Sequence, residues 1–224
     1  MLRMSIAQSS RTADQKVDRL APQQERSRQA RERIIAAAER VLRDRGVDGF
    51  SMAEVAAAAK MPVGNIYRRF DGKDDLLQAV KEIVSDRIRN TIADCLVQTG
   101  QRSLRDFISA FARSVEIAFS RDEYLNRALY HPTVVNANLA KSGLVARASI
   151  FDIFSTGLEP HISAIDDQNK VLVTKVAFSI IMNSAALKVR DNDSISADIS
   201  WPQFAAEFGD SAFFYVTSKL KLVE

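Results

Sequence analysis

Apolar residues recur at helical spacing through most of the chain, and the first such segment follows Glu25. Its apolar positions lie three or four residues apart, which places them on one face of a helix. Gly46 follows the last of them, and glycine suits the left-handed position just after a helix. Residues 1–24 show no such periodicity and include Pro22, so we expect a flexible basic tail there.

Two short helical segments come next. Ser51 and Glu54 have the spacing of a capping box, which predicts a helix that starts at Ser51 and runs to Ala59. A second helix is predicted from Pro62, where the missing N–H costs little at the first helical position, to Phe70. Two short helices joined by a tight turn are the outline of a helix-turn-helix. They would bury a small shared core of Val55, Ala56, Ala59, Ile66 and Phe70.

The rest of the chain also has the pattern of amphipathic helices. Apolar stripes follow Lys73, Ser103, Asp167 and Ser200, and Ser200 with Gln203 again has capping-box spacing. The helix after Asp167 is apolar nearly all round, so we expect it to be covered on two sides. The predicted fold class is therefore all-α.

The predicted organisation has three parts. They are a flexible basic tail over residues 1–24, a three-helix helix-turn-helix domain over residues 25–73, and a larger helical domain over residues 74–224.

Composition narrows the class of protein. With 46% hydrophobic and 26% charged residues, the chain is typical of soluble globular proteins. The single cysteine, Cys95, excludes an internal disulfide and, with only two histidines, leaves few ligands for zinc. No apolar signal segment opens the chain, and polar residues interrupt its longest apolar stretch, residues 171–187. We expect a soluble cytoplasmic protein that binds no metal, cofactor or membrane.

Positive charge is concentrated in the first third of the chain. Residues 1–73 hold 15 basic and 9 acidic residues, whereas residues 74–224 hold 16 and 19. Such asymmetry is typical of a segment that faces nucleic acid or a membrane, because neutralised phosphates supply most non-specific affinity for DNA. From charge alone, a solvated basic helix face is an equally good interpretation.

The second short helix has the chemistry to meet DNA, since the second helix of a helix-turn-helix enters the major groove. The Asn65 amide can bond the N6 and N7 atoms of adenine, and Val63 can contact a thymine methyl. Side chains around this helix would reach phosphates. The predicted base contacts are Val63, Gly64 and Asn65, and the predicted phosphate contacts are Arg31, Ser51, Tyr67, Arg69 and Lys73.

Residues 31–77 combine particular residue types at fixed spacing. The strongest part is Gly64-x-hydrophobic-Tyr67-x-x-Phe70-x-x-Lys73-x-x-Leu-Leu, preceded by Phe-Ser-Met and an Arg-x-x-Ile-Ile segment. This arrangement closely resembles the N-terminal domain of the TetR family of bacterial transcriptional regulators. The resemblance implies about nine helices, a DNA-binding head, dimerisation, and a divergent C-terminal domain whose ligand releases the protein from its operator.

Four positions depart from the family pattern. Lys60 stands at the turn position where the family usually has glycine, so the turn either accepts strain or takes another path. Pro62 and Val63 replace residues that are often more polar, which shifts specificity towards DNA shape and phosphate contacts. Arg69 replaces a frequent histidine and would strengthen a phosphate contact.

Aromatic residues in the second domain suggest a site for a small apolar or aromatic effector, since such sites often lie between helices. For each phenylalanine, plain core packing is the alternative. The predicted pocket residues are Phe107, Phe111, His131, Phe151 and Phe154.

The last two helices could form a four-helix bundle with those of a second copy, across a two-fold axis. The alternative is that both helices pack into one monomeric core. The predicted dimer interface comprises Val173, Ile180, Ile181, Phe204, Phe208 and Tyr215.

The expected function is that of a ligand-responsive DNA-binding regulator, most simply a dimeric repressor that a small molecule releases from a palindromic operator. The alternative is a DNA-binding regulator without a small-molecule effector, acting as an activator or through a protein partner. An enzyme is not expected, and no catalytic residue is assigned, because catalytic triad spacing and a glycine-rich phosphate loop are both missing from the sequence.

Overall fold

The computed structural model describes residues 5–98, 103–130, 137–190 and 198–221. These residues form nine α-helices and one short 3-10 helix, with no strand among them, which confirms the all-α prediction. The helices are α1 (Ser5–Arg45), α2 (Met52–Ala59), α3 (Val63–Tyr67), α4 (Lys73–Gln98), α5 (Leu104–Ser120), α6 (Glu123–Tyr130), α7 (Ala137–Leu158), η2 (Glu159–His161), α8 (Asp167–Arg190) and α9 (Trp201–Leu220).

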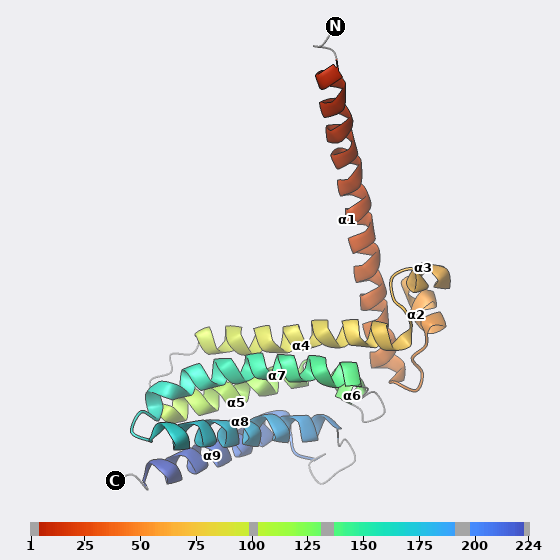
Figure 1. The fold of residues 1–224 in the computed structure, drawn as a ribbon. Helices are drawn as coiled ribbons and strands as arrows, with labels where there is room; N and C mark the ends of the chain where they lie inside the picture. The colour runs from red at the N-terminus through yellow and green to blue at the C-terminus, as the bar shows by residue number, and fades with distance from the viewer. Residues whose placement is uncertain (1–4, 99–102, 131–136, 191–197, 222–224) are drawn as a thin grey trace.

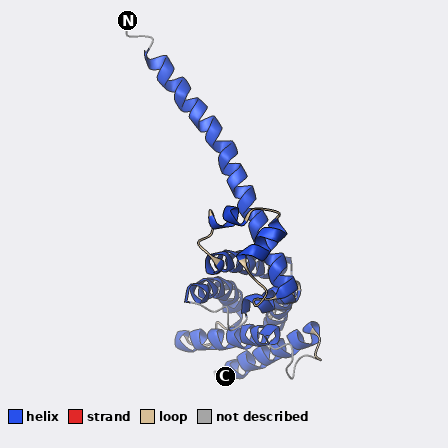
Figure 2. Ribbon diagram, turned by 90° about the vertical axis from the view of Figure 1, so that its right-hand side faces the viewer, coloured by secondary structure: helices blue, strands red, loops and turns tan. Residues whose placement is uncertain are grey.

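The helices form a small head at one end of a larger body (Figure 1). Helices α4, α5, α7, α8 and α9 run roughly alongside one another, with the closest packing between α5 and α9, α4 and α5, α4 and α7, and α8 and α9. Helix α1 rises steeply from the end of this bundle, and α2 and α3 lie beside it (Figures 1 and 2). We call α2, α3 and the adjoining part of α1 the head, and α4 to α9 the body.

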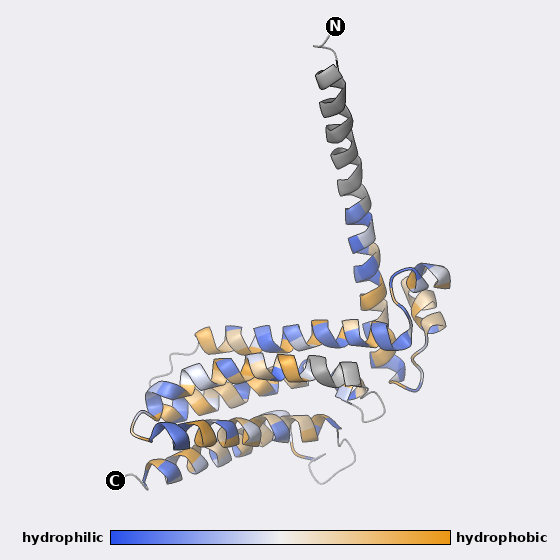
Figure 3. Cartoon of the chain, viewed as in Figure 1, coloured by the Kyte–Doolittle hydropathy of each residue, from blue (hydrophilic) through white to orange (hydrophobic). Residues whose placement is uncertain are grey.

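Helix α1 is longer than the sequence pattern indicated. It begins at Ser5, so the backbone of residues 5–24 is helical where a flexible tail was predicted. Once a helix exists, each further residue with a backbone N–H adds a hydrogen bond, so an extension needs no apolar face to continue it, and Pro22 leaves only its own bond unmade. Figure 3 shows how α1 changes from hydrophilic turns to hydrophobic ones where it reaches the other head helices.

The head has the core that the sequence predicts. Val55, Ala56, Ala59, Ile66 and Phe70 are all buried. Gly46 has φ 64° and donates its backbone N–H to the Leu42 carbonyl at 2.9 Å, so α1 ends where expected.

Both predicted capping sites start helices, but they differ in detail. The Ser51 hydroxyl accepts from the Glu54 backbone N–H at 3.2 Å, while the Glu54 carboxylate pairs with Arg45 of α1 at 2.7 Å instead of bonding back. At α9 the box is complete, with Ser200 and Gln203 each bonding the other's backbone.

Helix α8 has the length and composition of a membrane span, with a mean hydropathy of 1.4 over its most apolar stretch. Its interrupting polar residues therefore do not by themselves distinguish it from one. In the structure it packs against α5, α6, α7 and α9, and apolar helices in the core of soluble bundles have the same composition.

Candidate nucleic-acid interface

Helix α3 presents a short exposed surface at the edge of the head, made by Val63, Gly64, Asn65 and Tyr67, which we call the α3 tip. Val63 is 43% and Tyr67 56% exposed, while Ile66 on the opposite side is fully buried. A Cβ atom built on Gly64 would meet no atom within 4 Å. The structure thus brings the three predicted base-contacting residues together on a face whose backbone another molecule can approach closely.

The turn before α3 follows the path that glycine usually provides. Lys60 has φ 54° and ψ 48°, and it is the only non-glycine with positive φ in the described part of the chain. The turn is closed by hydrogen bonds from Lys60 N to Ala57 O (3.1 Å) and from Met61 N to Ala56 O (3.0 Å). Of the two outcomes expected for Lys60, the structure shows strain, on the order of 1 kcal/mol for a residue with a Cβ.

The bounds of α3 differ slightly from the prediction. Pro62 precedes the helix as its N-cap residue instead of opening it, and α3 ends at Tyr67 instead of Phe70. Phe70 N still donates to Ile66 O at 3.0 Å, so helical hydrogen bonding fades over these residues.

Two arginines of α1 hold the C-terminal end of α2. Arg40 Nη2 donates to the Ala58 carbonyl at 2.9 Å, and Arg33 Nη2 donates to the Ala59 carbonyl at 3.3 Å. The last carbonyls of a helix have no partner within it, and cations suit this end of the helix dipole. Neither arginine was predicted from the sequence to have a role in the head, although their spacing of seven places them on one face of α1.

Two of the predicted phosphate contacts are free to meet a ligand. Tyr67 extends from the α3 tip, and Arg31 is exposed on α1, with its guanidinium carbon 5.5 Å from the centre of the Phe70 ring. Tyr67 offers a hydroxyl and Arg31 a cation, and both groups can bond a phosphate.

Three other predicted phosphate contacts already have structural roles. Lys73 Nζ donates to the Val47 carbonyl at 3.3 Å, and Arg69 Nη1 donates to the Asn65 carbonyl at 3.0 Å. Ser51 caps α2 through its oxygen. Each still has donor capacity beyond these bonds, since lysine, arginine and serine can make several.

Acidic residues at the N-terminus of α4 make this helix end less open to anions. Asp74 and Asp75 lie in its first turn, and the Asp75 carboxylate accepts from the Asp71 backbone N–H at 3.0 Å. These carboxylates offset the attraction of the helix dipole for a phosphate near Lys73.

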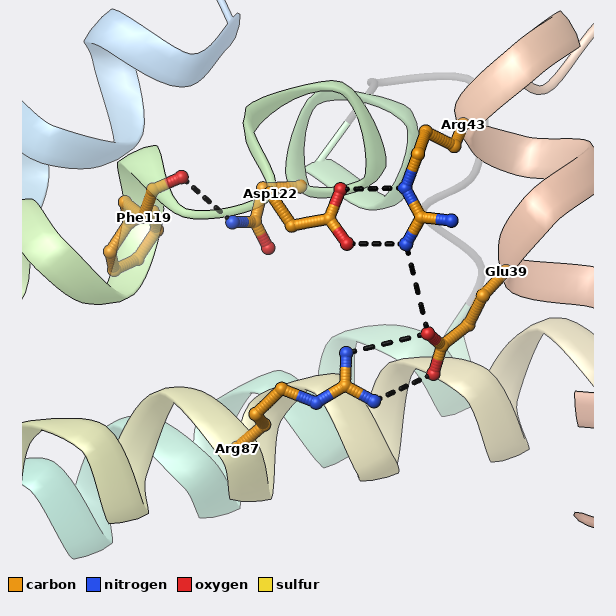
Figure 4. A network of polar contacts seen from close by, with 6 residues as sticks. Glu39, Arg43, Arg87, Phe119 and Asp122 are labelled. Carbon is orange, nitrogen blue, oxygen red and sulfur yellow. Dashed lines mark hydrogen bonds and ion pairs between the residues drawn. The ribbon is translucent and has the colours of Figure 1, made fainter. Parts of the chain in front are cut away.

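A network of charges joins the head to the body (Figure 4). Arg43 of α1 donates to both carboxylate oxygens of Asp122, between α5 and α6, at 2.9 and 2.5 Å. Arg87 of α4 donates to both oxygens of Glu39 on α1, at 2.9 and 3.4 Å. The hydrogen bonds from Arg43 hold the pKa of Asp122 below its usual range, and the same bonds raise the pKa of Arg43.

The predicted effector residues are mostly core residues. Phe107, Phe111 and Phe154 are buried, with ring centres 5.5 Å apart for Phe107 and Phe154 and 4.6 Å apart for Phe111 and Phe154. These three rings fill the space between their helices instead of lining a pocket, because tilted aromatic contacts are favourable in a core. Phe151 is half-buried beside an open groove on α7, and His131 lies outside the described residues.

The predicted dimer interface divides in two. Val173, Ile181 and Phe208 are buried within the chain's own core, so they cannot meet a second copy. Ile180 and Ile181 point about 100° apart on a helix, and the structure turns Ile181 inward. The half-buried members are Ile180, Phe204 and Tyr215, and the large exposed apolar residues of the two helices are Val171, Leu172, Leu187 and Phe214.

Comparison with known proteins agrees with the geometry of the head. Residues 34–80 match the family described as bacterial regulatory proteins, tetR family. No curated protein matches the chain.

Solved structures with a similar fold cover nearly the whole chain. A bacterial regulatory protein in the tetR family from Rhodococcus RHA1 has a TM-score of 0.63 and 19% identity, over 84% of this chain and 96% of that chain. A TetR family transcription regulator from Marinobacter aquaeolei VT8 has a TM-score of 0.59 and 16% identity, over 87% and 97%. The fatty acid degradation regulator FadR from Bacillus halodurans has a TM-score of 0.63 and 15% identity, over 82% and 94%.

At these identities the structures support the fold, and the matched domain supports the family. Residues 34–80 thus match the tetR family of bacterial regulatory proteins, and the chain as a whole has the fold of solved regulators of that family.

Proposed function

We propose that the protein is a dimeric repressor that binds a palindromic operator through α3 and leaves it when a small molecule binds the body. The observation that carries the proposal is the α3 tip. Its outer side is small or polar and exposed, while Ile66 anchors its inner side in the head core. A recognition helix needs both properties, because it must enter the major groove without unfolding.

The tip offers direct contacts with bases. No hydrogen bond is recorded for the Asn65 side-chain amide within the described residues, so the amide can bond an adenine edge. Val63 supplies methyl groups for thymine, and Gly64 lets the helix backbone come close. We therefore assign base contacts to these three residues and phosphate contacts to Tyr67 and Arg31, with Lys73, Arg69 and Ser51 in supporting positions.

Dimerisation through α8 and α9 is the second part of the proposal. These helices pack against each other and leave Leu172, Leu187 and Phe214 exposed. Joined with the same faces of a second copy, they would form a four-helix bundle that removes this apolar surface from water. A two-fold dimer would present two α3 tips to half-sites about one turn of DNA, roughly 34 Å, apart.

Release by a ligand requires a path from body to head. Helix α4 begins at Lys73, directly after the head, and continues through the body. Arg87 of α4 also holds Glu39 of α1, so a movement of α4 would carry the head with it. A ligand that prefers one spacing of the two heads would then change operator affinity.

Fluorescence anisotropy tests the DNA-binding proposal. The purified protein is titrated with the duplex found immediately upstream of its own gene, at several salt concentrations, with a shuffled duplex as competitor. We expect tight binding that the shuffled duplex does not displace, and light scattering that gives twice the chain mass. Equal displacement by both duplexes would show that the head reads phosphates alone at this site.

One observation favours a regulator without a small-molecule effector. Phe107, Phe111 and Phe154 pack against one another in the core, where the sequence suggested that they could line an effector pocket. If small-molecule fractions of a cell extract leave operator affinity unchanged while the protein stays folded, control by a protein partner or a role as an activator replaces ligand-driven repression.

A further inference from the structure

A small hollow lies between α4, α7 and α8, and a buried lysine opens onto it. The hollow has a volume of about 190 Å³. Lys81 of α4 is only 7% exposed, and its Nζ lies 5.7 Å from the centre of the Tyr130 ring. A Cβ atom on Gly143 would lie 3.7 Å from the same Nζ, so the ammonium group lies close against α7. No carboxylate pairs with Lys81 among the residues that the structure describes.

A second cation lines the same hollow. Arg147 of α7 has its guanidinium carbon 5.1 Å from the centre of the Phe178 ring, and no ion pair is recorded for it in the described ranges. Ser85, one turn along α4 from Lys81, adds a hydroxyl group. The sequence of residues 131–142, which leads from Tyr130 into α7, contains neither aspartate nor glutamate. In the part of the chain that the structure describes, the hollow thus gathers two cations, two hydroxyls and no carboxylate.

This arrangement is unfavourable for the protein alone. An ammonium group loses its hydration on burial, and among the described residues only the face of the Tyr130 ring, and no carboxylate, offsets that loss. Burial accordingly lowers the pKa of Lys81. Burial also raises the pKa of Tyr130 to about 12, so its hydroxyl remains a hydrogen-bond donor at neutral pH. Buried, unpaired ionisable groups in a hollow are typical of binding sites.

We propose that this hollow is the effector site and that its ligand is a small organic monocarboxylate. The inference rests on the proposed function and adds the chemical class of the effector. The carboxylate would accept hydrogen bonds from Lys81, Tyr130 and Arg147, the donors that recognise such a group best. The hydrocarbon part would lie against the apolar wall of the hollow, which is made by Ile88, Phe119, Ile150 and Met182.

Size and position further define the ligand. Sites for drug-sized molecules typically span about 300–1,000 Å³, so a hollow of about 190 Å³ suits a smaller acid. Lys81 follows the first residue of α4, Lys73, by only two turns of helix, about 12 Å. A carboxylate held between Lys81 and Arg147 would draw α4 and α7 together close to the head.

Isothermal titration calorimetry on the full chain tests the site. Benzoate and hexanoate are the probes, and benzamide and hexanamide are their neutral counterparts. We expect at least one carboxylate to bind, with its amide at least tenfold weaker and Lys81→Met reducing carboxylate affinity at least tenfold. Lys221→Met, which removes an exposed lysine at the end of α9, should change nothing.

A second measurement separates a binding lysine from a structural one. If Lys81 served only the fold, Lys81→Met would lower the melting temperature. Our proposal requires the opposite, an unchanged or higher melting temperature without ligand, together with loss of the shift that the carboxylate causes. Equal binding of amide and carboxylate, binding that survives Lys81→Met, or no binding of either carboxylate would overturn the proposal.

Operator titrations keep the two proposals distinguishable. Binding of carboxylate that depends on Lys81 supports the site even if the protein binds no operator, in which case only the proposed function fails. Carboxylate binding that weakens operator affinity in the native chain, but not in Lys81→Met, supports both. Lys81-dependent binding with unchanged operator affinity would overturn the assignment of the hollow as the effector site.

Discussion

At the scale of single residues, Lys60 shows how neighbouring contacts can hold a residue in an unfavourable backbone conformation. A side chain with a Cβ atom is strained at φ 54°, yet the residues on both sides leave no other path. Ala59 is buried in the head core, and the carbonyls of Ala58 and Ala59 are held by two arginines of α1. The turn geometry is therefore fixed by tertiary contacts, although the sequence has no glycine where the family usually places one.

Lys60→Gly should stabilise the protein. Glycine removes the left-handed strain but gives the unfolded chain more freedom, so we expect a net gain of about 0.5–1 kcal/mol in the free energy of unfolding. Urea denaturation followed by circular dichroism measures the change. Lys60→Ala is the control, because it removes the charge and keeps the Cβ. A gain of the same size in Lys60→Ala would assign the effect to charge, and the strain argument would fail.

Asn65 should carry part of the discrimination between DNA sequences. We expect Asn65→Ala to narrow the difference between operator and shuffled duplex by about 1–3 kcal/mol, because a bidentate contact with adenine is lost. Tyr67→Phe should instead weaken binding to both duplexes alike, since it removes a phosphate contact. Competition anisotropy gives both values. Equal loss on all duplexes from Asn65→Ala would show that it contacts the backbone only.

Residues at the α3 tip could be predicted from sequence, whereas Arg33, Arg40 and Lys81 could not. The exposure of Val63 and Gly64 follows from local periodicity, because Ile66 must face inward. The roles of the other three depend on which carbonyl or ring lies opposite them after folding. Nothing within one helix distinguishes Lys81 from a solvated lysine.

At the scale of the helices, a glycine allows α7 to approach the Phe107 ring of α5 closely. A Cβ atom built on Gly157 of α7 would lie 2.3 Å from the Phe107 ring of α5. The Phe107 ring also stacks on the His161 ring, with 6.0 Å between the two ring centres. Phe107 therefore has little room to move. The aromatic core of the body therefore depends on a small residue at this crossing.

Gly157→Ala should destabilise the body by about 1–3 kcal/mol, the usual effect of overpacking a core. Gly64→Ala is the matched control, because its new methyl group would meet no atom and alanine favours a helix. Thermal unfolding should therefore show a lower melting temperature for the first variant and an unchanged or slightly higher one for the second. Equal melting temperatures for both would mean that Phe107 moves aside freely.

Helices could be located from sequence more reliably than their inward faces. Capping residues and apolar stripes place the starts of α2, α5 and α9 correctly. In α8 the stripe covers nearly the whole circumference, so sequence could not decide that Ile181 faces the core and Ile180 its edge. The extension of α1 to Ser5 contains few large apolar residues and includes Pro22, so the sequence pattern did not indicate it.

At the scale of the molecule, the head and body meet through charged side chains as well as through α4. The Arg43–Asp122 pair is bidentate and only partly exposed, and it lies beside the Glu39–Arg87 pair (Figure 4). These ion pairs can fix the angle between head and body. They still allow that angle to change, because each partly solvated ion pair contributes little to the stability of one arrangement.

Asp122→Asn should lower the free energy of unfolding by about 1 kcal/mol at neutral pH. This corresponds to a melting temperature lower by roughly 2–4 °C. Folding lowers the pKa of Asp122. The ionised carboxylate therefore stabilises the folded state fully at pH values above the pKa that Asp122 has in the unfolded chain. This stabilisation is lost as the pH falls through the lowered pKa. The difference between the two proteins should therefore shrink in acid, as thermal melts at pH 7 and pH 3 would show. A constant difference would contradict the assignment to this carboxylate.

Because two arginines of α1 cap α2, we expect the α2–α3 turn and α1 to unfold locally together and not separately. The backbone amides of Lys60 and Met61 can reach solvent only if the turn unwinds, and unwinding would strip the Ala58 and Ala59 carbonyls from Arg40 and Arg33. Hydrogen exchange at the turn is thereby coupled to undocking of α1, although the two lie far apart in sequence. We therefore expect the segment proposed to read DNA to share the local stability of a long helix and to keep its conformation when no operator is bound.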